Sequence, residues 1–257
     1  MDPAANHLDI VAQHLRLLAL GEPVLKPVYD HGTGEVRPAE HVEPRDVVIV
    51  EGLLPFHARA LRECFDVKVY LDPEEELRHR WKIERDCATR GYLIEEVVAE
   101  LRRRETDAAR FVRPQRGFAD LVLSFHRQST VKAYANLGAR IVLRPTLPHP
   151  PLDELVGTLR RYGYEPVRRF LDRALGHPAE ILEVDGGCPP GVGGDVAQIV
   201  WRRMHPDAGL LRDRLGLYLH ATGEERRSEA LALAQLLIVS HVVDALHGGF
   251  RALEVVR

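Results

Sequence analysis

The sequence predicts an α/β protein with a mixed, mainly parallel sheet, and the distribution of its apolar residues carries this prediction. Residues 47–50 form the run Val-Val-Ile-Val, which is typical of a strand covered on both faces of a parallel sheet. Further short apolar runs alternate with longer charged segments that have helical spacing, as in strand–helix–strand units. The expected strands are residues 47–50, 67–71, 121–125, 141–143 and 180–184.

The expected helices follow from apolar residues three or four positions apart. Residues 7–20 show this spacing and are followed by Gly21, which suits the position after a helix end. The Pro- and Gly-rich residues 21–44 predict a loop. Prolines near residue 148 divide one expected domain into a core, residues 1–145, and a C-terminal extension, residues 146–257, packed on it. The other expected helices are residues 73–90, 94–105, 153–162, 195–204 and 224–246.

The composition excludes several classes of protein. The chain has 257 residues, of which 45% are hydrophobic and 28% charged, as is ordinary for a soluble globular protein. No uninterrupted apolar run reaches the roughly 18–20 residues that span a bilayer, so we expect no membrane association. Three widely spaced cysteines, Cys64, Cys87 and Cys188, favour a reducing compartment, which predicts a cytoplasmic protein.

A basic segment stands out in a chain whose net charge is −3. Residues 78–116 hold 11 Lys and Arg against 7 Asp and Glu. Lys82, Asp86 and Arg90 are four residues apart and share one helix face, with Arg85 beside them. Such a cluster suits phosphate, because a guanidinium group can donate two hydrogen bonds to phosphate oxygens. A solvated helix with ion pairs would show the same pattern. The acidic chain as a whole argues against a nucleic-acid partner.

Two further sets of polar residues are candidates for binding. Glu51 directly follows the expected strand at 47–50, and ligands of open α/β sheets bind beyond the carboxyl ends of strands. An acid there can hold a metal or its water shell, although a loop or helix-capping carboxylate would look the same. Tyr29, His31 and Thr33 lie in the expected loop, where they could recognise a sugar or form a structural turn.

Taken together, these segments resemble the phosphoribulokinase branch of the phosphoribulokinase/uridine kinase family of P-loop kinases. Their order and spacing carry the resemblance, since each motif alone is weak. The motifs are Lys-Pro-Val-Tyr-Asp-His-Gly-Thr-Gly at 26–34, Val-Ile-Val-Glu-Gly-Leu at 48–53, Trp-Lys-Ile-Glu-Arg-Asp at 81–86, Arg-Gly at 90–91 and Arg-Pro-Gln at 113–115.

The resemblance implies a P-loop-kinase-like three-layer fold and a kinase of the Calvin cycle. Such an enzyme uses ATP and Mg²⁺ to convert ribulose 5-phosphate to ribulose 1,5-bisphosphate, and it commonly forms a homo-oligomer. Catalysis of this kind rests mostly on positioning and charge neutralisation. The positions that the resemblance assigns to catalysis are Glu51, Lys82, Arg85 and Asp86, with Glu51 and Asp86 also serving the metal. Those that it assigns to the substrate are Tyr29, His31, Arg90, Arg103 and Arg104.

One part of the family pattern is missing from this sequence. The family begins with a strand and a Gly-x-x-x-x-Gly-Lys-Ser/Thr phosphate loop, followed by an Asp that acts as general base, and the 257 residues contain no such loop. We therefore expect an N-terminally truncated kinase that lacks the first strand and is inactive in isolation. Two alternatives stay open, namely a uridine kinase-like nucleoside kinase and a non-catalytic interaction protein.

Overall fold

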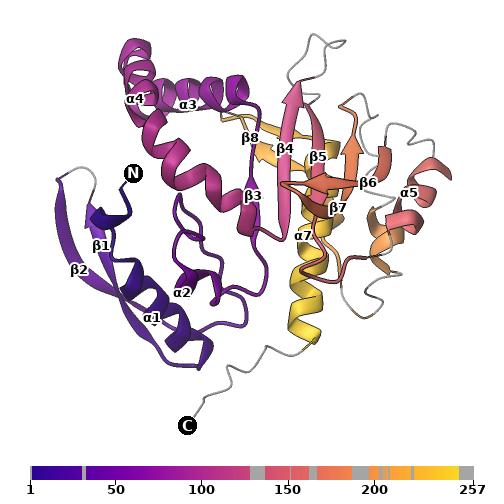
Figure 1. The fold of residues 1–257 in the computed structure, drawn as a ribbon, viewed down its shortest axis with the longest axis horizontal. Helices are drawn as coiled ribbons and strands as arrows, with labels where there is room; N and C mark the ends of the chain where they lie inside the picture. Colours follow the sequence, from indigo (N-terminus) through magenta and orange to yellow (C-terminus); the bar gives the residue numbers. More distant parts are fainter. Residues whose placement is uncertain are drawn as a thin grey trace. The chain divides into compact units, whose positions relative to one another are not determined.

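The computed structural model describes residues 2–30, 33–127, 137–150, 152–161, 167–186, 197–202, 205, 207, 209–220 and 223–248 (Figure 1). The chain forms two compact units. The first unit contains Met1–Asp66 and Thr106–Phe118, and the second contains Val67–Glu105 and Ala119–Arg257.

A five-stranded sheet is the centre of the second unit, with the strand order β3-β4-β5-β7-β6. β3 and β4 are parallel and pair Val69 with Leu121, whereas the three other neighbouring pairs of this sheet are antiparallel. A shorter ribbon pairs β8 with β9 in the same unit. The strands are β3 (Val69–Leu71), β4 (Leu121–Arg127), β5 (Leu137–Leu143), β6 (Val167–Ala174), β7 (His177–Val184), β8 (Leu217–Leu219) and β9 (Glu225–Arg227).

The α/β class and the mixed sheet are confirmed, but the described pairings are more antiparallel than the sequence predicts. One expected parallel strand is also absent, because the run Val47–Val50 is not a strand in this structure. Ile49 is 88% exposed, and Val47 and Val48 are also exposed. A strand is stable only where a neighbour satisfies its backbone N–H and C=O groups, and no strand pairs with this run in the described part of the chain.

The sheet is covered by helices that continue the hydrophobic core. α7 (Glu229–His247) packs against β5, and α5 (Leu152–Arg161) packs against β6 (Figure 1). Ser228 caps α7 by accepting a hydrogen bond from the Leu231 N–H, at 3.3 Å. Among the described helices, α7 alone is long and apolar enough to cross a membrane, a property that it shares with core helices of globular proteins. Its side chains Leu233, Leu236 and Leu237 lie in the core cluster with Trp201.

The first unit begins with an amphipathic helix and a hairpin. α1 (Leu8–Ala19) ends before Gly21, whose φ of +82° is a backbone conformation that favours glycine. α1 contacts β1 (Val24–Asp30), which pairs with β2 (Glu35–Val42) in an antiparallel ribbon (Figure 1). The helical segments of this unit also include η1 (Pro3–Ala5), α2 (Arg59–Arg62), η2 (Ala108–Val112) and η3 (Arg113–Phe118).

Two hairpins are missing from the sequence prediction. The ribbon β1–β2 occupies the segment that was expected to be a loop, because its prolines and charged side chains hide the pattern of an exposed strand. The hairpin β6–β7 turns at Leu175 and Gly176, which have φ values of +54° and +81°. This geometry matches a two-residue turn with positive φ at both positions. Sequence rules predict such a turn from Asn-Gly or Asp-Gly, whereas here Leu175 occupies the first position.

The helices that carry the basic segment agree with the prediction. α3 (Glu75–Arg90) and α4 (Ile94–Asp107) lie within two residues of the expected bounds. α3 ends at Gly91, which has a φ of +69°. The organisation into a single domain stays a prediction, and the sheet crosses the expected division near residue 145, because β5 pairs with β7.

Candidate functional site

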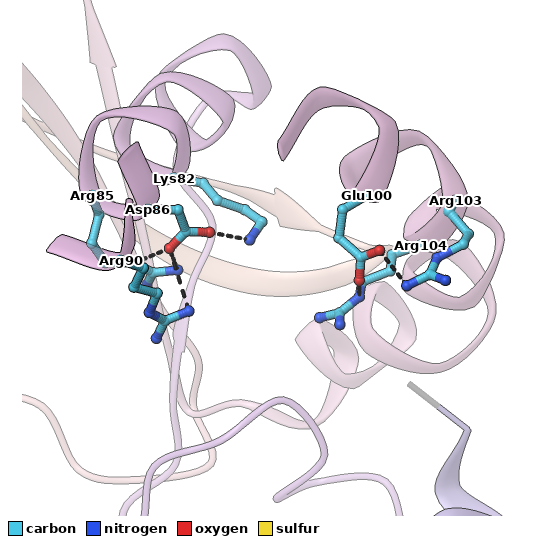
Figure 2. Close-up of polar contacts among 7 residues, drawn as sticks. All are labelled: Lys82, Arg85, Asp86, Arg90, Glu100, Arg103 and Arg104. Carbon is cyan, nitrogen blue, oxygen red and sulfur yellow. Dashed lines mark hydrogen bonds and ion pairs between the residues drawn. The ribbon is translucent and has the colours of Figure 1, made fainter. Parts of the chain in front are cut away.

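Asp86 gathers three cations on α3, and this cluster is the strongest candidate site of the second unit (Figure 2). Lys82 Nζ lies 2.6 Å from Oδ2, Arg85 Nε donates to Oδ1 at 2.9 Å, and Arg90 Nη1 lies 3.4 Å from Oδ1. The carboxyl side chain is buried, whereas the three cations are partly exposed. The helical spacing of four residues therefore brings together the group that the sequence predicts.

The charges around Asp86 keep its carboxyl group ionised. Burial alone would raise the pKa of Asp86, but the hydrogen bonds from Lys82 and Arg85 and the charges of these two groups lower it further than burial raises it. Asp86 therefore remains a carboxylate at neutral pH and holds the three cations in place. One negative charge among three positive ones leaves an excess of positive charge that an anion can neutralise.

A second cluster lies on α4, the next helix along the chain (Figure 2). Arg103 Nη2 contacts Glu100 Oε2, and Arg104 Nε contacts Glu100 Oε1. Residues three and four positions apart lie on one face of a helix, so α4 itself aligns both guanidinium groups with one carboxylate. The predicted substrate residues Arg103 and Arg104 are thus brought together, and their common partner is a residue that the sequence analysis did not select.

Glu51 lies in the first unit, in an exposed segment that is neither helix nor strand. The chain just beyond it is fixed by Gln115, a buried side chain that the sequence analysis assigned to the family motif without a role. Gln115 Oε1 accepts from the Phe56 N–H at 2.8 Å, and its Nε2 donates to the carbonyls of Leu53 at 2.8 Å and Phe111 at 2.7 Å. Gln115 therefore holds the segment that begins two residues after Glu51.

Two further residues are predicted to bind the substrate, and the structure describes one of them. Tyr29 is an exposed residue of β1, opposite Val36 of β2. His31 lies outside the described residues. The predicted roles of both residues stay predictions.

The residues that the family resemblance assigns to a metal do not form a metal site within one unit. The described residues contain no group of three or more His, Cys, Asp or Glu side chains that could hold a metal ion. Both oxygens of Asp86 already face cations, and three positive charges within 3.4 Å repel a further divalent cation. Asp86 is therefore suited to holding Lys82, Arg85 and Arg90 and poorly suited to binding Mg²⁺. The metal role of Glu51 stays a prediction.

Comparisons with known proteins point to one family. The "Phosphoribulokinase / Uridine kinase family" model matches residues 1–132. The chain is 41% identical to a phosphoribulokinase of Synechocystis over 123 residues, which is 48% of this chain and 37% of the relative. It is 37% identical to a chloroplastic phosphoribulokinase of Triticum aestivum, again over 48% of this chain and over 30% of the relative. A uridine kinase of Oceanobacillus iheyensis is 32% identical over 47% of this chain and 59% of the relative.

The fold also matches a solved structure. A phosphoribulokinase from Rhodobacter spheroides superposes with a TM-score of 0.52 at 18% identity, over 79% of this chain and 71% of that chain. By sequence, the chain spans about a third of the length of the phosphoribulokinases that it matches. The family match covers more than half of the 257 residues, and the chain therefore belongs to the phosphoribulokinase/uridine kinase family.

Proposed function

We propose that the chain supplies the phosphate-handling helices of an ATP-dependent sugar-phosphate kinase that converts ribulose 5-phosphate to ribulose 1,5-bisphosphate. The observation that supports this proposal is the pair of cationic clusters on α3 and α4. Five cations stand against two carboxylates, so the two clusters together carry an excess of three positive charges. Phosphoryl transfer needs such groups, because negative charge is spread over the transferred phosphoryl oxygens in the transition state.

The two clusters have different roles in this proposal. Lys82, Arg85 and Arg90 neutralise phosphate charge during transfer, and Asp86 keeps them together. Arg103 and Arg104 bind the phosphate of ribulose 5-phosphate. When bound, Mg·ATP would supply the phosphoryl group that the 1-hydroxyl of the sugar accepts as it loses its proton. The role that we propose for Glu51 is to hold the metal.

The wider setting follows from the same proposal. A phosphoribulokinase would work in the Calvin cycle, as a homo-oligomer and in a cytoplasmic compartment. Cys64 and Cys87 are free thiols, which supports a reducing environment.

Equilibrium binding to ribulose 5-phosphate and to uridine tests the proposed substrate class. We expect isothermal titration to detect binding of ribulose 5-phosphate to the 257-residue chain. The affinity should fall as salt is added, because the contacts are largely ionic. Uridine lacks a phosphate and should bind more weakly. Tighter binding of uridine would support the alternative nucleoside kinase, which the uridine kinase relative makes the second candidate. Binding of neither compound would favour a non-catalytic interaction protein.

A substitution of Arg104 tests whether ribulose 5-phosphate binds at this residue. Arg104→Gln should weaken the binding of ribulose 5-phosphate about tenfold or more, because a hydrogen bond between charged groups is lost. Arg59→Gln is a matched control, because Arg59 Nε makes the same helical i,i+4 contact with Glu63 Oε1, at 2.6 Å, on α2 of the other unit. The control should bind within about twofold of the wild type. Equal losses in both variants would contradict the assignment of Arg104.

A further inference from the structure

We propose that Glu100 is an internal anion that occupies Arg103 and Arg104 and that a phosphate monoester displaces on binding. The proposal rests on the proposed function, because it concerns the same guanidinium pair. It makes Glu100 a positioning residue that sets the affinity of α4 for phosphate.

The geometry of the contact is the first argument. Both guanidinium groups converge on one carboxylate, one on each oxygen (Figure 2). A carboxylate and a phosphate present the same kind of acceptor pair to arginine. A phosphate monoester offers one more oxygen and a charge of about −1.5 to −2 at neutral pH, whereas a carboxylate offers −1. Phosphate is therefore the stronger partner for a pair of guanidinium groups that Glu100 has already aligned.

The exposure of the contact is the second argument. The side chains of Arg103 and Arg104 are 75% and 47% exposed, and that of Glu100 is 23% exposed. Ion pairs at this exposure contribute little to stability, so an incoming anion can replace Glu100 at small cost. Asp86 differs from Glu100 in its exposure and in its number of partners. Its side chain is only 3% exposed, and it holds three cations. Asp86 is a fixed anchor, and Glu100 is an exchangeable one.

A purely structural role of Glu100 predicts a different result. A glutamate placed three and four residues before arginines stabilises an isolated helix, and its loss would only weaken α4. A weakened helix cannot bind phosphate more tightly. Removal of an internal competitor, in contrast, must increase the affinity for an external anion.

The test is the affinity of the 257-residue chain for inorganic phosphate and for ribulose 5-phosphate, by isothermal titration, in the wild type and in Glu100→Gln. We expect Glu100→Gln to bind inorganic phosphate about three- to tenfold more tightly. Glu84→Gln is the matched control, because it removes the same charge from the Arg80 ion pair on α3 of the same unit. The affinity of that control for inorganic phosphate should stay within about twofold of the wild-type value. The same is expected of Glu100→Asp, which keeps the negative charge.

Several outcomes would overturn the inference. Equal or weaker phosphate binding by Glu100→Gln would do so, as would equal tightening in Glu84→Gln or the absence of measurable phosphate binding in every variant. Circular dichroism at the titration temperature confirms that α4 remains folded in each variant. If the wild type binds ribulose 5-phosphate and Glu100→Gln does not bind phosphate more tightly, only this inference fails. If Glu100→Gln binds phosphate more tightly and no variant binds ribulose 5-phosphate, the proposed substrate fails and the exchange at Glu100 stands.

Discussion

Replacing Asp120 by alanine should lower the free energy of unfolding of the second unit by about 3–5 kcal/mol, because the side chain is a buried charge with three partners. Asp120 is 1% exposed and directly precedes β4. Its Oδ2 accepts from the Lys68 N–H at 2.8 Å and lies 3.0 Å from Lys68 Nζ, and its Oδ1 accepts from Thr146 Oγ1 at 2.6 Å. Alanine would leave a backbone donor unsatisfied and the mostly buried Lys68 ammonium without its counter-charge.

The backbone of residue 120 is also hydrogen-bonded, and alanine would keep these bonds. The Asp120 N–H donates to the Lys68 carbonyl at 2.8 Å, and the Arg144 N–H donates to the Asp120 carbonyl at 3.0 Å. Asp120 thereby connects the starts of β3 and β4 to the segment that follows β5. Loss of the side chain should therefore loosen the starts of β3 and β4, while the antiparallel pairing of β4 with β5 remains.

Urea unfolding followed by tryptophan fluorescence measures this effect in the unit that contains Asp120. Both tryptophans of the chain, Trp81 and Trp201, belong to the second unit. Asp172→Ala is the matched control, because Asp172 is an exposed aspartate of β6 whose ion pair with Arg140 spans 3.7 Å. The control should change the free energy of unfolding by less than about 1 kcal/mol. An Asp120→Ala variant as stable as Asp172→Ala would show that the buried network does not hold the sheet together.

Much of the second unit could be predicted from the sequence, because its elements have local signals. α3 and α4 show helical spacing, Gly91 marks the end of α3, and β4 begins with the apolar run Leu-Val-Leu. The cluster around Asp86 was predictable for the same reason, since each of its cations is at most four residues from Asp86. The contact of Glu100 with Arg104 has the same spacing and could have been found by the same rule.

The errors arose where structure depends on distant partners. Residues 47–50 have the composition of a buried strand, but strand formation requires a neighbour, which no local pattern reveals. Gln115 contacts Leu53 and Phe56 across about 60 residues of sequence, so no spacing rule could assign it a role. The hairpin β6–β7 turns on Leu175, a residue that turn rules reject.

The second large expected effect is the absence of turnover by the 257-residue chain alone. The chain has four lysines, none of which follows a glycine, so no Gly-Lys of a phosphate loop is present in these residues. Such a loop stabilises the β- and γ-phosphates with several backbone N–H groups and one ammonium. Loss of one transition-state donor alone slows an enzyme about 10²–10³-fold. Without the whole set, phosphoryl transfer by these residues should fall to the background rate, although we still expect α3 and α4 to bind phosphate.

We infer that these 257 residues carry phosphate-binding helices of a kinase but, with no phosphate loop among them, do not catalyse phosphoryl transfer on their own. The decisive measurement is ADP formation by the purified chain in a coupled assay with Mg·ATP and ribulose 5-phosphate, run beside the titration of ribulose 5-phosphate. We expect saturable binding of ribulose 5-phosphate and ADP formation no faster than in the absence of the chain. Robust phosphorylation of ribulose 5-phosphate by the 257 residues alone would contradict the account.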